Sequence, residues 1–123
     1  MIKKVEDLNV YKRSYKLALE IHKETLKFPS EDRFELGSQM RRASKSIPSN
    51  IAEGFSKRKF LKEYKRYLNI ARASNDEMFN HLKFARDLGY FDERKYQKFV
   101  DEYTIVGKQL TNLIKTWEKF DEI

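Results

Sequence analysis

Residues 39–58 of the chain read QMRRASKSIPSNIAEGFSKR, and this stretch decides how the chain folds. Apolar or small residues recur at intervals of three or four from just before this stretch and through it, at Leu36, Met40, Ala43, Ile47, Ile51 and Gly54. Pro48 lies inside this series and does not shift its phase. A helix that ended before Pro48 and a new helix after a loop would have no reason to share one angular register. The stretch therefore predicts a single helix that is bent near Pro48.

A proline inside a helix has a cost that this interpretation must accommodate. Pro48 removes the hydrogen bond to the carbonyl of Ser44 and crowds that carbonyl, at a cost of about 3 kcal/mol. The hydroxyls of Ser44, Ser46 and Ser49 are placed to satisfy part of the freed backbone. The alternative is that Pro48 occupies the first position of a new helix, which Ile47 would cap poorly. The unbroken register favours the continuous helix.

The segment before this helix predicts another helix over residues 8–28. Its apolar side chains cover an arc of roughly 200°, wider than the stripe of about 100° that a bundle helix needs. The excess predicts a second contact, such as another subunit. Pro29 is expected to end this helix. Ser30 is then expected to cap the next one, with Glu31 and Asp32 at its positive end.

Two more helices follow the opening stretch. One is predicted over about 60–88, and Gly89 suits the position just after its C-terminus. The other begins after Asp92, an expected N-cap, and its apolar stripe extends to Trp117. Short connections favour antiparallel neighbours. The predicted fold class is all-α, an antiparallel up-down-up-down four-helix bundle that forms one domain over residues 1–123.

Composition excludes several kinds of chemistry and indicates the location of the protein and the charge of its partner. The chain has no cysteine, which excludes disulfides, thiolate catalysis and cysteine-bound zinc. The first residues, MIKKVEDLNV, lack the apolar core of a signal peptide, and no run approaches the ~20 apolar residues that span a bilayer. We therefore expect a cytoplasmic protein without membrane contact. Its 26 Lys and Arg against 19 Asp and Glu give a net charge of +7, which suits a polyanionic partner.

The usual catalytic and metal-binding patterns are missing. The two histidines, His22 and His81, fit neither the zinc motif HExxH nor a Glu-x-x-His pair. Ribonucleases of the HEPN type carry Arg, about four to six residues and then His. Here eight residues separate Arg13 from His22, and eight separate Arg72 from His81. We interpret His22 as a hydrogen-bonded core residue, and we predict no catalytic residue, metal or cofactor.

Two basic clusters carry the functional hypothesis. The helix cluster projects from the first half of the bent helix, away from its apolar stripe, and consists of Arg41, Arg42 and Lys45. The turn cluster surrounds the connection to the next helix and consists of Lys57, Arg58, Lys59, Lys62, Lys65 and Arg66. Lys and Arg bind phosphates by releasing counterions. A solvated polar face is the other interpretation, and both stay open. No base-reading motif appears, so little sequence specificity is expected.

Five residues of the opening stretch are expected to be structural: Gln39, Pro48, Asn50, Glu53 and Gly54. Gly54 belongs to the apolar stripe, which Gln39 and Asn50 flank. Glu53 lies one step further round. A polar network or a subunit contact is the expected role of these side chains.

The chain also resembles a known family. The segments FPSEDRFELGSQMRRASKSIPSNIAEGFSKR (28–58) and EYKRYLNIARASNDE (63–77) resemble four-helix bundle proteins encoded in intervening sequences of bacterial 23S ribosomal RNA genes. The resemblance extends from about Leu8 to Phe120. The family is similar to the accessory variability determinant of diversity-generating retroelements, a homopentameric barrel that binds nucleic acid and a reverse transcriptase. The resemblance implies a homo-oligomer, with a pentamer favoured, that presents basic residues to RNA or DNA.

Two functions lead at this point, and a third, RNA cleavage that depends on His22 or His81, would need activity that is lost in His22→Ala or His81→Ala. The first is a non-catalytic, oligomeric bundle that binds nucleic acid through its two basic clusters. The second is a protein-interaction scaffold, for a reverse transcriptase or another partner protein, without a direct nucleic-acid function.

Overall fold

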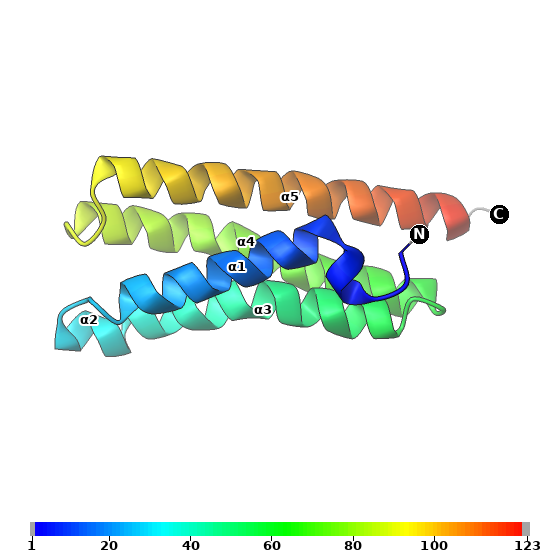
Figure 1. The fold of residues 1–123 in the computed structure, drawn as a ribbon, viewed down its shortest axis with the longest axis horizontal. Coiled ribbons are helices and arrows are strands. Elements are labelled where there is room, and N and C mark those ends of the chain that lie inside the picture. Colours follow the sequence, from blue (N-terminus) through cyan, green and yellow to red (C-terminus); the bar gives the residue numbers. More distant parts are fainter. Residues whose placement is uncertain (1, 122–123) are drawn as a thin grey trace.

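The computed structural model describes residues 2–121, with side chains described up to Trp117. Every element in this part of the chain is helical. A short 3-10 helix, η1 (Val5–Asp7), precedes five α-helices: α1 (Asn9–Thr25), α2 (Ser30–Phe34), α3 (Leu36–Ser56), α4 (Leu61–Asp87) and α5 (Glu93–Asp121). The four long helices run alternately up and down the molecule (Figure 1). The predicted all-α antiparallel bundle is confirmed.

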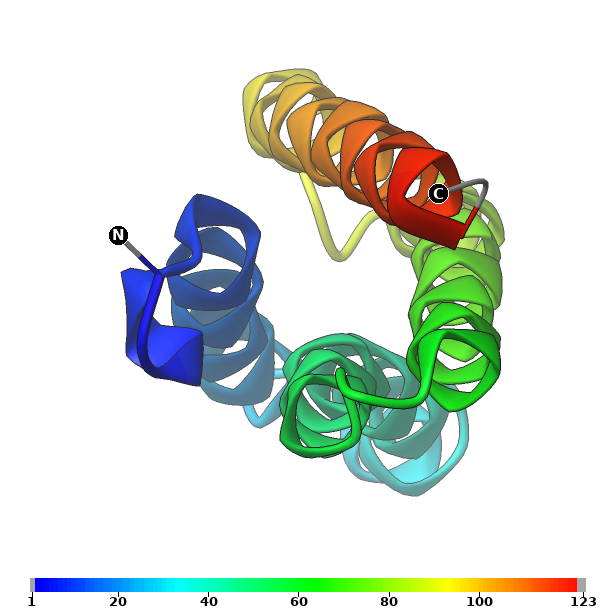
Figure 2. The same ribbon diagram turned by 90° about the vertical axis from the view of Figure 1, so that its right-hand side faces the viewer.

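The four long helices are arranged around one core (Figure 2). α3 packs extensively against both α1 and α4, and α4 packs against α5, whereas α1 and α5 contact each other much less. The core consists of large side chains from all four long helices and includes Ile21, Met40, Ile47, Tyr64, Leu68, Met78, Leu82, Phe99, Tyr103 and Leu110. None of the helices in the described residues is long and apolar enough to cross a bilayer.

α3 passes through Pro48 without interruption, as the register predicted. Ile47 and Ile51, on either side of the proline, are fully buried. The alternative, in which Pro48 begins a new helix, is therefore wrong. The Ser44 hydroxyl donates to the carbonyl of Arg41, 3.2 Å away. The Ser46 hydroxyl contacts Asn50 on the same helix and Ser74 on α4. The bend at Pro48 stays a prediction.

The predicted start of this helix at Ser30 is wrong, because the chain breaks at Glu35 (φ −93°, ψ −92°) and forms two helices. Ser30 is the first residue of α2 and Pro29 occupies the cap position, where its carbonyl accepts from the backbone N–H of Arg33. The break leaves the carbonyl of Arg33 without its partner four residues later. The guanidinium of Arg41 donates to this carbonyl and stabilises the break.

The other helix ends follow simple local chemistry. α1 ends at Thr25, earlier than predicted, and Phe28 then turns inward, with its ring 4.7 Å from that of Tyr90. Gly89 follows α4 at φ +83°, a conformation that favours glycine. The carboxylate of Asp92 accepts the backbone N–H of Lys95 at 2.8 Å, as expected of an N-cap.

Candidate nucleic-acid interface

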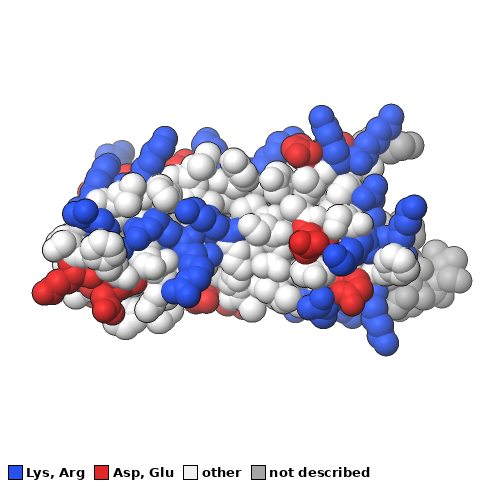
Figure 3. All heavy atoms as spheres, turned by 90° about the horizontal axis from the view of Figure 1, so that it is seen from below, with Lys and Arg blue, Asp and Glu red and all other residues white. Residues whose placement is uncertain are grey.

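The two basic clusters lie at separate places along α3. The helix cluster occupies its first half, and the turn cluster begins where α3 ends and continues into the first two turns of α4. From residue 41 to residue 57 the rise of an α-helix gives roughly 24 Å. Figure 3 views the face that includes α2 and α3, where Lys and Arg form one group left of the middle and another toward the right, with uncharged side chains between them and Asp and Glu at the lower left end. The structure therefore does not merge the clusters into one continuous patch.

Arg41 points into the bundle instead of toward solvent. It is half-buried, and its guanidinium donates to the Thr25 hydroxyl on α1 at 2.9 Å and to the Arg33 carbonyl on α2 at 2.8 Å. Gly37 leaves room for it, because a Cβ there would stand 3.0 Å from the guanidinium. The donors of Arg41 hold α1, α2 and α3 together. We therefore leave Arg41 out of the candidate interface.

Arg58, in the turn after α3, is also occupied by an internal contact. It is half-buried, donates to the carbonyl of Phe55 at 2.9 Å, and lies over the Phe55 ring at 4.0 Å from its centroid. The carbonyl belongs to the last turn of α3, where backbone acceptors lack intrahelical partners. Arg58 therefore caps the C-terminus of α3, and its guanidinium is only partly accessible to a ligand in solvent.

Lys57 and Arg66 are held on the surface by acidic neighbours. Lys57 pairs with Glu53 at 3.0 Å, which raises the pKa of Lys57, and Arg66 pairs with Glu63 at 3.0 Å. Both cations also flank the ring of Tyr67, at 5.5 and 4.4 Å from its centroid. Exposed pairs of this kind are weak and are screened by salt. A phosphate can therefore compete for these two cations.

The strongest candidates are Arg42, Lys45, Lys59 and Lys62. All four side chains are exposed, and none forms a hydrogen bond or ion pair with another residue in the described part of the chain. Lys65 is exposed as well. Arg42, Lys45, Lys59 and Lys62 are therefore the four cations of the two clusters that can bind phosphate without breaking an internal contact among the described residues.

His22 reports the positive field around the helix cluster. Partial burial and the charges of Lys45 and Arg41 lower the pKa of this imidazole. His22 is half-buried, and its Nδ1 atom has no hydrogen-bond partner among the described residues. The prediction of a hydrogen-bonded core histidine is therefore wrong. His22 lies instead at the edge between α1 and α3, where the cations of α3 reach it.

Of the expected structural residues, Gln39, Asn50 and Gly54 lie between α3 and α4, whereas Pro48 faces α1 and Glu53 is exposed and pairs with Lys57. The Asn50 amide donates to the carbonyl and the hydroxyl of Ser46, and that hydroxyl is 2.8 Å from the hydroxyl of Ser74 on α4. Gly54 brings the helices close, since a Cβ there would lie 2.9 Å from the Cβ of Tyr67. Gln39 lines a polar depression of about 380 Å³ together with Arg42, Ala43, Ser46, Ser74 and Glu77.

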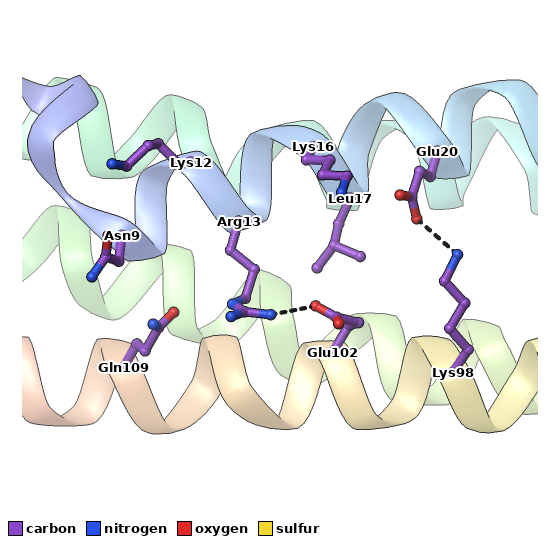
Figure 4. A pocket seen from close by; sticks show the side chains of 9 residues that line it. All are labelled: Asn9, Lys12, Arg13, Lys16, Leu17, Glu20, Lys98, Glu102 and Gln109. Atoms are coloured by element: carbon purple, nitrogen blue, oxygen red, sulfur yellow. Dashed lines mark hydrogen bonds and ion pairs between the residues drawn. The ribbon is translucent and has the colours of Figure 1, made fainter.

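A charged cleft between α1 and α5 escaped the sequence analysis (Figure 4). It has a volume of about 460 Å³ and is bridged by Arg13 and Glu102 at 2.6 Å and by Lys98 and Glu20 at 3.5 Å. Lys12 and Lys16 line it as well, and neither forms an ion pair within the described residues. Arg13 and Glu102 stand 89 residues apart in the chain, so the spacing of Lys12 and Lys16, one helical turn apart on α1, was the one signal of this cleft in the sequence.

α4 also holds a pair of titratable groups at the helical spacing of four residues. Nε2 of the buried His81 lies 2.7 Å from a carboxylate oxygen of Glu77, one turn earlier on α4. Across the described residues, no group of three or more His, Asp or Glu side chains is placed to hold a metal ion.

Residues 6–112 match the family described as "23S rRNA-intervening sequence protein". The chain belongs to this family. The family resemblance inferred from the motifs is thereby confirmed. A similar solved structure is that of a protein of unknown function from the S23 ribosomal protein family of Bacteroides thetaiotaomicron VPI-5482, determined at 1.70 Å. It is 23% identical, with a TM-score of 0.77, and the match covers 86% of this chain and 95% of that one. At this identity the similarity shows that the two proteins share a fold, and no more. No curated protein sequence matches the chain.

Proposed function

We propose that this family member is a non-catalytic, oligomeric bundle that binds the phosphate backbone of nucleic acid with little sequence specificity. The observation that carries the proposal is the exposure of Arg42, Lys45, Lys59 and Lys62 without a partner in the described residues. A net charge of +7 adds a general attraction for polyanions. The absence of cysteine fits a cytoplasmic location, which is part of the same proposal.

The charge arrangement sets the expected salt dependence. Each neutralised phosphate on duplex DNA contributes about −0.9 to the slope of log affinity against log salt. Four contacts therefore weaken binding about 150-fold between 50 and 200 mM salt. Flexible Lys and Arg side chains on an exposed helix and turn contact phosphates and read no bases, so the affinity should vary little between sequences.

Fluorescence anisotropy with a labelled DNA duplex tests the proposal. We expect the double variant Lys59→Gln/Lys62→Gln to weaken binding and to reduce the salt slope by about 1.8. The matched control is Lys83→Gln/Lys108→Gln, which removes the same charge from exposed positions outside both clusters. An affinity that is equal at both salt concentrations, or an equal loss in the control, would refute nucleic-acid binding through the turn cluster.

The oligomeric part of the proposal is supported by the outer surface of α1. Tyr15 and Leu19 are 49% and 50% exposed, although they belong to its apolar arc. They line a groove of about 340 Å³ with Pro48 and Ala52 of α3. Together with the family resemblance, which favours a pentamer, this surface supports self-association. Light scattering at micromolar concentration should give five times the 14.8 kDa of one chain, and a monomer would refute it.

The second candidate function is a scaffold for a partner protein, and the same apolar groove favours it. A protein partner bound there would bury Tyr15 and Leu19 without using the basic clusters. A pull-down after nuclease treatment separates the two functions. A partner that is retained by the wild type, and lost from Leu19→Glu but not from Lys59→Gln/Lys62→Gln, would favour the scaffold.

A further inference from the structure

Phe60 is an exposed aromatic residue at the centre of the turn cluster. It lies between the end of α3 and the start of α4, and 68% of its surface is exposed. Lys59 precedes it and Lys62 follows two residues later, and both side chains are exposed without a partner in the described residues. A bare ring among cations is the combination that proteins use to bind unpaired bases and their phosphates together.

The position of Phe60 contributes little to the stability of the fold. Phe60 is the N-cap residue of α4, and no side chain makes a capping hydrogen bond there. Ser, Thr, Asp and Asn are the residues that stabilise this position. α5 provides the contrast, because its N-cap Asp92 accepts the backbone N–H of Lys95. An exposed ring also gains little from the hydrophobic effect. Folding alone therefore does not explain a phenylalanine at this position.

The other aromatic rings of the turn cluster are already covered. The guanidinium of Arg58 lies over the Phe55 ring, and Lys57 and Arg66 flank the Tyr67 ring. Phe60 forms no ring contact or cation–π contact with another residue in the described range. It is the ring of the cluster that is open to a ligand.

We propose that the turn cluster binds single-stranded nucleic acid, with an unpaired base stacked on the ring of Phe60 and the flanking phosphates held by Lys59 and Lys62. This inference rests on the proposed nucleic-acid function and adds the class of ligand. A base inside a duplex presents its face to its neighbours and cannot stack on a side chain without leaving the helix. Phe60 therefore gives the protein a preference for single strands, whereas the lysines alone would bind either form.

Anisotropy with a labelled DNA strand of about 12 nucleotides, free or paired with its complement, tests this preference. We expect Phe60→Leu to weaken binding of the single strand about 10-fold, which corresponds to about 1.4 kcal/mol, and to leave duplex binding within about twofold. The salt dependence of both should persist, because the lysines remain. Phe34→Leu is the matched control, since Phe34 is 75% exposed but has the acidic neighbours Glu31, Asp32 and Glu35.

A second variant separates lost stacking from damaged folding. Phe60→Ser supplies the missing N-cap, so we expect Tm to rise by about 3 °C while single-strand affinity falls as in Phe60→Leu. Opposite signs in the two measurements exclude misfolding as the cause of weaker binding.

The outcomes distinguish this inference from the function on which it rests. If the wild type binds both probes with steep salt dependence but Phe60→Leu leaves the single strand unaffected, stacking is refuted and phosphate binding stands. If Phe60→Leu weakens both probes equally, Phe60 is not selective for unpaired bases and the inference is again refuted. If the wild type binds neither probe, both proposals are wrong.

Discussion

The same substitution at two adjacent arginines of α3 should affect two different properties, the stability of the fold and the affinity for nucleic acid. The Arg41 side chain donates to Thr25 and to the carbonyl of Arg33, whereas the Arg42 side chain is exposed and makes no hydrogen bond with the described residues. Replacement by Met keeps the unbranched stem and removes the charged donors. Arg41→Met should therefore destabilise the fold, and Arg42→Met should weaken nucleic-acid binding.

The magnitude follows from the two hydrogen bonds. A hydrogen bond from a charged donor contributes about 1.5–3 kcal/mol when buried, and Arg41 is half-buried, so we expect a total loss of about 2 kcal/mol. With a urea m-value of about 1.5 kcal/mol/M, the midpoint should fall by about 1.3 M. For Arg42→Met the change should stay within about 0.5 kcal/mol, as for most exposed positions.

Urea unfolding followed by far-UV circular dichroism measures this difference. Both variants must be compared at one protein concentration, because self-association would shift the midpoint. Anisotropy with the DNA duplex supplies the second measurement, in which Arg42→Met should bind more weakly than Arg41→Met. Equal midpoints for the two variants would mean that Arg41 is not the tie between α1, α2 and α3.

Three further predictions concern single positions. Gly54→Ala should lower stability by about 1 kcal/mol despite its better helix propensity, because the new Cβ would stand 2.9 Å from the Cβ of Tyr67; a higher urea midpoint would contradict this. Because the pKa of His22 is lowered from 6.5 in the folded state, its contribution to stability is full above pH 6.5 and is lost as the pH falls toward the lowered value; His22→Gln should therefore reduce the loss of stability between pH 7.5 and pH 5.5 in urea unfolding. Asp92→Ala removes the cap that holds the N–H of Lys95 and should cost about 1 kcal/mol, measured by Tm; an unchanged Tm would refute the cap.

The candidate interface was predictable only in part. Charge density along the chain located the turn cluster, and Lys59 and Lys62 proved exposed and unpaired within the described residues. The same density could not separate Arg41 from Arg42, although one points inward and the other outward. Position along a helix gives the direction of a side chain around its own axis, but a long Arg can reach a neighbouring helix from the edge of the apolar stripe.

The sequence by itself determined the helices and their inward faces. The spacing of Met40, Ile47 and Ile51 carried α3 through Pro48, and Gly89 and Asp92 marked the turn between α4 and α5, because periodicity and capping depend on neighbours a few residues away. Only the tertiary structure decided the break at Glu35 and the charged cleft between α1 and α5. The break is stabilised by Arg41, which also joins it to α1, and the cleft is bridged by Arg13 and Glu102, which stand 89 residues apart. Such contacts form only after the helices have packed, so no local pattern in the sequence predicts them.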